Sequence, residues 1–114
     1  MIKKLFSNLK NSISGLKVAC KENSFILELT LGIFLIPYLA FLDVEILLKL
    51  LILVTYIFLL SLEIINTAIE ILCNKITQEY NTDIKKIKDL GSAAVFIVLI
   101  ILFYLIFSTL FPIL

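Results

Sequence analysis

A long apolar run near the middle of the chain closes with Glu63-Ile-Ile-Asn66-Thr67-Ala-Ile-Glu70-Ile-Leu-Cys-Asn74. On an α-helix its polar residues return to nearly the same direction, because they are separated by steps of three, four, seven and eleven residues. We call this face the polar stripe; it comprises Glu63, Asn66, Thr67, Glu70 and Asn74. A carboxylate within a membrane-spanning helix is unfavourable unless it faces a partner or water, so the stripe indicates a functional surface. The alternative is a helix that leaves the bilayer early, with Glu70 and Asn74 merely solvated.

The composition indicates a membrane protein. Of the 114 residues 61% are hydrophobic, and the mean hydropathy is +1.13, whereas the apolar share of a soluble domain is normally about half. The absence of histidine removes the usual acid–base group at neutral pH and the commonest zinc ligand. Cys20 and Cys73 are isolated, and we interpret them as reduced, small apolar residues rather than as a redox site. Three short spans bury little surface, so we expect self-association.

Apolar side chains recur at helical spacing through residues 1–21, and lysine, serine and asparagine occupy most of the other positions. This pattern predicts an amphipathic helix that lies on the membrane surface, with its lysines toward anionic head groups. The apolar residues are spaced rather than continuous and no small-residue cleavage site follows them, so a cleaved signal peptide is not expected.

Three later segments are apolar enough to cross a bilayer core of roughly 30 Å. The predicted spans are residues 25–42, 46–72 and 90–113, and the charged segment 73–89 is predicted to be a cytoplasmic loop. The third span opens with the small residues Gly91-Ser-Ala-Ala94, which allow helices to approach closely. The sequence thus predicts an all-α membrane protein in which residues 1–114 form a single domain.

The placement of lysine indicates how the chain is oriented. Five lysines precede the first predicted span and four lie between the second and third, whereas Lys49 is alone in the first turn. Cytoplasmic segments are enriched in lysine and arginine, so both lysine-rich segments and the N-terminus are expected in the cytoplasm, and the C-terminus on the periplasmic side. The carboxylates of the polar stripe then meet the cytosol, where ATP and Mg²⁺ are available.

This boundary has the groups that phosphoryl transfer requires, namely oxygen ligands for Mg²⁺, a positive charge near the phosphates and a base for the attacking hydroxyl. The candidates are Glu22 and Glu70 for the ligands, Lys88 for the charge and Glu63 for the base. A base at the lipid boundary makes sense if the nucleophile is itself a lipid hydroxyl. The chain has no glycine-rich phosphate loop, Walker sequence or soluble-kinase catalytic loop. A proton or ion pathway, or a small channel or assembly subunit, fits the same spacing equally well.

Two motifs carry a resemblance to a known family. The run Glu63-Ile-Ile-Asn66-Thr67-Ala-Ile-Glu70 is followed by Glu79-Tyr80 and then by Lys88-Asp89-Leu-Gly-Ser92-Ala-Ala-Val95. Together they closely resemble the small integral-membrane diacylglycerol kinases of bacteria, a family related to undecaprenol kinase. The similarity extends over nearly the whole chain through upstream matches at Gly15-Leu-Lys17, Glu22, Phe25, Glu28 and Leu42-Asp-Val44.

The resemblance implies an ATP-dependent lipid kinase that phosphorylates the free hydroxyl of diacylglycerol to give phosphatidic acid, a step of phospholipid recycling. It also implies a homotrimer in the bacterial inner membrane, with a surface helix and three spans in each chain and with active sites between protomers at the cytoplasmic face. The expected partners are diacylglycerol, MgATP and the membrane, with Mg²⁺ as the cofactor and no nucleic acid.

The resemblance also assigns roles to individual residues. Glu63 matches the catalytic base and Asn66 a polar residue beside it, while Glu22 and Glu70 match the carboxylates that hold divalent metal on the nucleotide. Further contacts to the nucleotide are expected from Glu79, Tyr80, Lys88 and Asp89, and contacts to the lipid from Phe25, Glu28 and Ser92.

Three positions depart from the family pattern. Asn74 stands where an aspartate is common, Asn11 where an aromatic residue often contacts the nucleotide, and Lys4 where an arginine is frequent. The departure at Asn74 leaves a supporting role there open. The segment from Cys20 to Glu28 lacks the arginine- and histidine-bearing pattern that we associate with undecaprenol kinase, which favours diacylglycerol.

Two alternative functions stay open. The first is undecaprenol kinase, which shares the fold and the first motif. The second belongs to another class: a non-enzymatic, oligomeric proton or ion conduit that uses Glu28 and Glu63.

Overall fold

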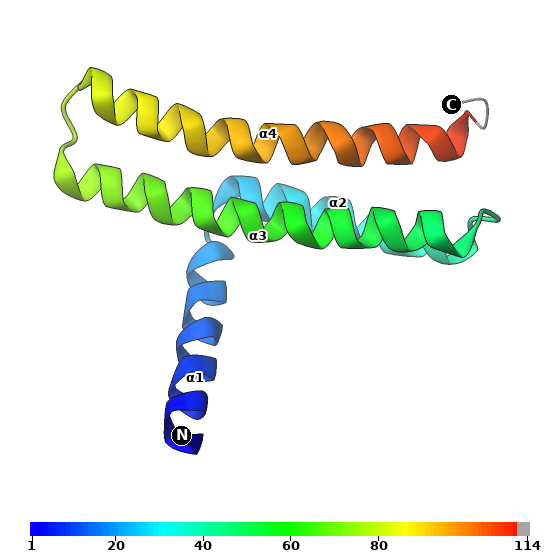
Figure 1. Cartoon of the computed structure of the whole chain (residues 1–114), viewed down its shortest axis with the longest axis horizontal. Coiled ribbons are helices and arrows are strands. Elements are labelled where there is room, and N and C mark those ends of the chain that lie inside the picture. Colours follow the sequence, from blue (N-terminus) through cyan, green and yellow to red (C-terminus); the bar gives the residue numbers. More distant parts are fainter. Residues whose placement is uncertain (112–114) are drawn as a thin grey trace.

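The computed structural model describes residues 1–111. Four α-helices account for nearly all of this part of the chain, which contains no strand (Figure 1). The helices are α1 (Ile2–Ala19), α2 (Asn23–Phe41), α3 (Ile46–Ile76) and α4 (Thr82–Leu110). The all-helical fold predicted from the sequence is therefore confirmed.

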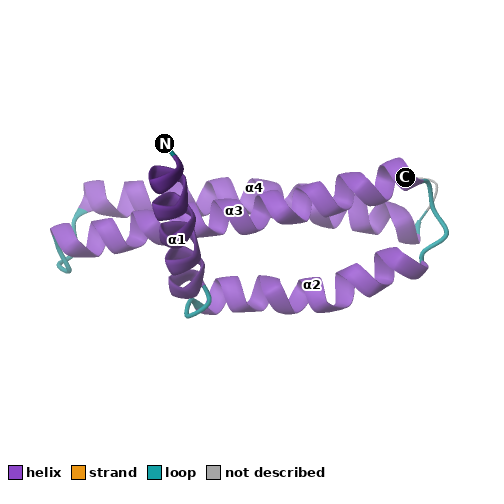
Figure 2. Ribbon diagram, turned by 90° about the horizontal axis from the view of Figure 1, so that it is seen from below, coloured by secondary structure: helices purple, strands orange, loops and turns teal. Residues whose placement is uncertain are grey.

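Helices α2, α3 and α4 are long and apolar enough to cross a membrane. The most extensive packing is between α3 and α4, which run antiparallel, and α2 packs on α3 (Figures 1 and 2). Their common core consists of Leu35, Leu39, Ile52, Tyr56, Leu59, Val95, Val98 and Leu102. On each helix these residues are three, four or seven positions apart, so they form one buried face. On α3 the polar stripe begins one turn beyond Leu59, where this core ends.

The helices α3 and α4 continue into the segment that the sequence predicts to be a cytoplasmic loop. Of the predicted loop 73–89, residues 77–81 alone separate the two helices. Asn81 caps α4, because its side-chain oxygen accepts hydrogen bonds from the backbone N–H groups of Asp83 (2.9 Å) and Ile84 (3.1 Å). The charge of this segment argues against burial in lipid, but it does not prevent a helix that packs against a neighbour. Residues 112–113 of the predicted third span lie outside the described residues.

Helix α1 leaves the bundle at a steep angle near the start of α2, and the connected ends of α3 and α4 extend beyond it (Figure 1). Its apolar side chains are not covered by the rest of the chain; these are Ile2, Leu5, Phe6, Leu9, Ile13 and Leu16. An uncovered apolar face is compatible with a helix that lies on a membrane surface, and that location stays a prediction.

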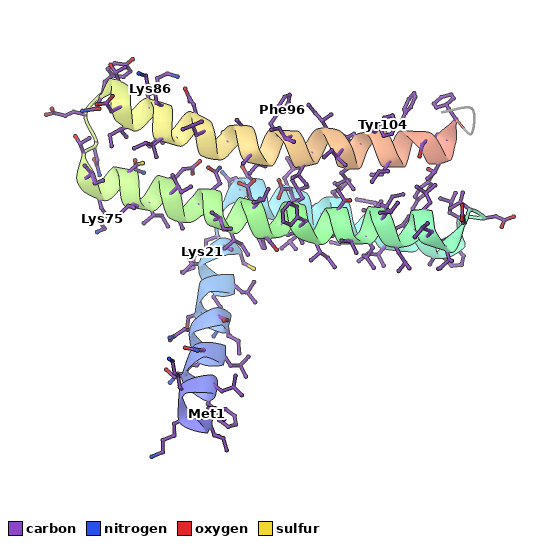
Figure 3. All side chains as sticks on the ribbon, viewed as in Figure 1. Met1, Lys21, Lys75, Lys86, Phe96 and Tyr104 are labelled. Atoms are coloured by element: carbon purple, nitrogen blue, oxygen red, sulfur yellow. The ribbon has the colours of Figure 1, made fainter. Side chains whose placement is uncertain are left out.

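The two ends of the bundle differ in chemistry. Figure 3 shows Lys75 and Lys86 beside the connection between α3 and α4, and Lys21 where α1 joins α2, whereas Tyr104 lies toward the other end of α4. At that other end the Tyr38 hydroxyl lies 2.7 Å from Thr109 Oγ1, which joins α2 to α4. The lysine-bearing end is the one that the sequence predicts to face the cytoplasm.

Candidate active site

A groove of about 670 Å³ lies on the bundle beside the polar stripe. Its polar part is formed by three stripe residues of α3, which are Glu63, Asn66 and Glu70. Its walls are Ser24, Leu27, Glu28, Thr30, Leu31 and Phe34 of α2 and Ser92, Val95, Phe96, Leu99 and Phe103 of α4. One part of the groove is therefore rich in carboxyl groups, and the remainder is apolar and aromatic.

Carboxyl groups from two helices meet in this groove. Glu63 and Asn66 of α3 are buried together with Glu28 of α2, at 6–8% exposure. The carboxyl groups of Glu28 and Glu63 lie next to each other. Thr67 is another buried stripe residue. Its hydroxyl donates a hydrogen bond to the Glu63 backbone carbonyl (2.9 Å), so this hydrogen bond lies within α3. The predicted base and the predicted lipid contact are thus neighbours.

Asn66 connects the stripe to α4. Its amide nitrogen donates a hydrogen bond to Glu70 Oε1 (3.3 Å), and its amide oxygen lies against Gly91 of α4. A Cβ atom built on Gly91 would overlap this oxygen and lie 3.4 Å from Asn66 Cγ. The close approach therefore requires glycine, and it places Ser92, the next residue, in the groove wall.

Two acceptor atoms of the groove side chains have no hydrogen-bond partner within the described chain: Glu28 Oε2 and Asn66 Oδ1. Buried polar atoms are nearly always hydrogen bonded in folded proteins. Asn66 Oδ1 is covered by Gly91, so of the two acceptors it is Glu28 Oε2, on the α2 wall of the groove, that suits a ligand group that donates a hydrogen bond, such as a hydroxyl.

Glu22 and Glu70 are the residues predicted to hold metal. Glu70 is half-buried in the groove, and Glu22 is half-buried immediately before α2. Both carboxyl groups are near enough to Glu63 to act on it electrostatically. Within residues 1–111 no three histidine, cysteine or acidic side chains are arranged to hold a metal on their own. Mg²⁺ is commonly held by one or two carboxylates together with nucleotide phosphates and water, and Glu22 and Glu70 fit that pattern.

The other residues predicted to contact the nucleotide do not line the groove. Lys88 donates a hydrogen bond to Asn74 Oδ1 (2.8 Å), which joins the start of α4 to the last residue of the polar stripe. Asp89 forms an ion pair with Lys85 (2.7 Å), and Glu79 and Tyr80 are exposed in the connection between α3 and α4. All four lie in the connection between α3 and α4 or in the first eight residues of α4.

The residues predicted to contact the lipid are placed differently from one another. Glu28 and Ser92 line the groove, whereas Phe25 is buried at 4% exposure and does not. The sequence interpretation missed several groove residues, above all Ser24, Phe34, Phe96 and Phe103. Helical spacing could have identified three of them. Ser24 lies four residues before Glu28 and so shares its helix face. Phe96 and Phe103 lie four and eleven residues after Ser92 and share the face of Ser92.

Two comparisons with known proteins bear on this site. The family model described as prokaryotic diacylglycerol kinase matches residues 10–110, a range that includes the polar stripe and both walls of the groove. The chain is also 36% identical over 98 residues to a diacylglycerol kinase from Haemophilus influenzae, and the alignment covers 85% of this chain and 83% of the relative. The resemblance drawn from the two sequence motifs is confirmed.

Proposed function

Because the chain belongs to the prokaryotic diacylglycerol kinase family, we propose that it transfers the γ-phosphate of MgATP to the free hydroxyl of diacylglycerol, which gives phosphatidic acid and ADP. The family match and the relative support a lipid kinase with membrane-spanning helices. The choice of diacylglycerol as acceptor rests on the activity named for that relative and on the sequence between Cys20 and Glu28.

The observation that carries this proposal is the unpartnered acceptor Glu28 Oε2 beside Glu63, in a groove that is otherwise largely apolar. A lipid alcohol has a hydroxyl donor at its polar end and long apolar chains behind it. Phe34 and Phe103 lie farthest along the two groove walls from the start of α2 and α4, so they suit the apolar end of such a ligand. Undecaprenol is also a lipid alcohol, and the groove alone does not favour one over the other.

Glu63 is the proposed general base. As the lipid hydroxyl oxygen attacks the γ-phosphorus, Glu63 accepts the hydroxyl proton, a P–O bond forms to the lipid, and the P–O bond to ADP breaks. The burial of Glu63 beside Glu28 suits a base whose substrate hydroxyl is held at the edge of the membrane rather than in bulk water. Asn66 orients Glu70 through their hydrogen bond.

Glu22 and Glu70 are the proposed holders of Mg²⁺ on the nucleotide, and the metal when bound neutralises charge on the phosphates. Lys88 is proposed to add a positive charge near the phosphates. Its ammonium group already lies near the polar stripe through its bond to Asn74. Contacts to the remainder of the nucleotide are proposed for Glu79, Tyr80 and Asp89, which are exposed near the connection between α3 and α4.

We place the reaction at the cytoplasmic face of the bacterial inner membrane, which the gathering of lysines at one end of the bundle supports. We also propose a homotrimer with active sites between protomers. Much of the apolar surface of α2, α3 and α4 is exposed in the single chain, which leaves area for both lipid and neighbouring protomers.

The proposal is tested by giving purified protein, in mixed micelles or vesicles, diacylglycerol and MgATP labelled at the γ-phosphate. The label should move to the lipid. Glu63→Gln should abolish turnover and leave the oligomer unchanged in size-exclusion chromatography, because an amide does not accept the proton. The matched control is Glu45→Gln, the same change in an exposed residue just before α3, which should keep full activity. A fully active Glu63→Gln enzyme would refute the role of base.

Competition between diacylglycerol and undecaprenol in one assay decides the acceptor. If undecaprenol is labelled in preference to diacylglycerol, undecaprenol is the acceptor and the protein is still a lipid kinase. Labelling of neither lipid, together with ion flux into liposomes without nucleotide, would overturn the kinase reading in favour of an ion conduit.

A further inference from the structure

Tyr56 makes a polar contact between α3 and α2 beside the groove. Its hydroxyl donates a hydrogen bond to the backbone carbonyl oxygen of Glu28 over 2.8 Å, and its side chain is 4% exposed. A buried tyrosine hydroxyl requires a partner. Here the partner is the backbone of the residue whose carboxyl group lies beside Glu63.

Gly32 makes room for this contact. A Cβ atom built on Gly32 would overlap the Tyr56 hydroxyl oxygen and lie 2.6 Å from the ring carbon Cζ. Any larger residue at this position would therefore push the tyrosine away from α2 or push the two helices apart. The backbone of α2 and the hydroxyl of Tyr56 fit together at this one point along the helix.

The contact contributes to fixing the position of α2 along α3. Glu28 and Gly32 are one turn apart on α2, and Tyr56 and Glu63 are two turns apart on α3, so each pair lies on one face of its helix. We propose that Tyr56 is a positioning residue that holds Glu28 beside Glu63 and thereby shapes the part of the groove that binds the lipid hydroxyl. This inference rests on the proposed function, in which Glu28 contacts the lipid and Glu63 accepts its proton.

The alternative is that Tyr56 serves core packing alone. Its ring belongs to the apolar core with Leu35, Leu59 and Val95, and packing by the ring does not need the hydroxyl. Tyr56→Phe keeps the ring and removes only the O–H group. A packing role predicts less folded enzyme with unchanged KM values, whereas a positioning role predicts a change in KM for the substrate that Glu28 contacts.

Steady-state kinetics of Tyr56→Phe separate these two roles. We expect the KM for diacylglycerol to rise about five-fold, the size of effect that corresponds to one neutral hydrogen bond, with the KM for MgATP unchanged. Tyr38→Phe is the matched control, because it removes another hydroxyl that joins two helices, to Thr109 at the far end of the bundle. Tyr38→Phe should leave both KM values unchanged. An unchanged KM for diacylglycerol in Tyr56→Phe would overturn the inference.

A double-mutant cycle with Glu28→Gln tests whether Tyr56 acts through Glu28. If it does, Tyr56→Phe should add nothing to the KM for diacylglycerol that Glu28→Gln already shows. Additive effects of the two substitutions would mean that Tyr56 acts by another route, and would overturn the inference.

A measurement that needs no kinase activity keeps this inference separate from the proposed function. In a chain with Cys20→Ala and Cys73→Ala, the pair Glu28→Cys and Glu63→Cys reports how often the two positions meet, through the rate of intramolecular disulfide formation. Tyr56→Phe should slow this rate and Tyr38→Phe should not. If the cysteine-pair chain and its Tyr56→Phe and Tyr38→Phe variants form the disulfide at the same rate, the positioning role is overturned. If Tyr56→Phe slows disulfide formation but the wild-type protein has no kinase activity, the lipid kinase proposal alone is refuted.

Discussion

Gly91→Ala should lower the activity of the folded enzyme. The new methyl group would overlap Asn66 Oδ1, so the amide must move by about 1 Å to regain ordinary van der Waals contact. The bond from Asn66 to Glu70 is already 3.3 Å long, and a shift of that size breaks it. A hydrogen bond to a charged group contributes about 1.5–3 kcal/mol. If the transition state needs Glu70 in this orientation, the loss of the bond lowers kcat/KM by up to roughly 10- to 150-fold.

The stability of the same variant should fall moderately. Alanine in a helix interior is more favourable than glycine by about 0.5–1 kcal/mol, whereas an off-rotamer Asn66 costs about 0.5–1.5 kcal/mol and the lost hydrogen bond about 1.5–3 kcal/mol. The free energy of unfolding should therefore fall by about 1–4 kcal/mol. The assay is kcat/KM for diacylglycerol phosphorylation, with thermal unfolding in detergent measured on the same preparation. Gly15→Ala is the control, because a Cβ there meets nothing within 4 Å, and it should keep wild-type activity. A Gly91→Ala enzyme with wild-type kcat/KM would show that the Asn66–Glu70 contact has no part in turnover.

Further predictions follow from the metal site, the core and the start of α4. Removal of divalent metal with EDTA should abolish phosphorylation, and added Mg²⁺ should restore it, because Glu22 and Glu70 are proposed to bind nucleotide through the metal. Activity that survives EDTA would exclude that role. Leu59→Ala should lower the free energy of unfolding by about 2–5 kcal/mol, since Leu59 is 0% exposed in the core. A denaturant titration in detergent measures this change, and an unshifted midpoint would contradict the packing described. Asn81→Ala should remove the two cap hydrogen bonds of α4 and destabilise its first turn by about 1 kcal/mol. Hydrogen exchange at Asp83 and Ile84 should then speed up, and unchanged protection would argue against the cap.

The helices and the polar stripe could be predicted from the sequence because both depend on local spacing. Glu63 and Asn66 recur at helical intervals, so their common face follows from helix geometry before any packing is known. The membrane spans follow from apolar length alone. The structure buries both side chains in one groove, and the function of the stripe stays a prediction.

The contacts between helices could not be predicted in the same way. Whether Tyr56 faces Gly32, or Lys88 faces Asn74, depends on how far one helix is shifted along the other, and that shift is set by every contact between them. The length of α4 was missed for a related reason. The charge of residues 82–89 predicts a loop, whereas the cap at Asn81 and the packing of α4 on α3 allow the helix to begin at Thr82.

The groove is open along its side, since Thr30, Phe34 and Phe96 in its walls are exposed. In the proposed lipid kinase, an acceptor dissolved in the bilayer would reach the carboxyl groups by lateral diffusion, without desorbing into water, and the charged product would leave the same way. The concentration that governs the rate is then the mole fraction of acceptor in the surrounding amphiphile rather than its amount per volume. Adding inert phospholipid or detergent at a fixed total amount of diacylglycerol should slow the enzyme by surface dilution.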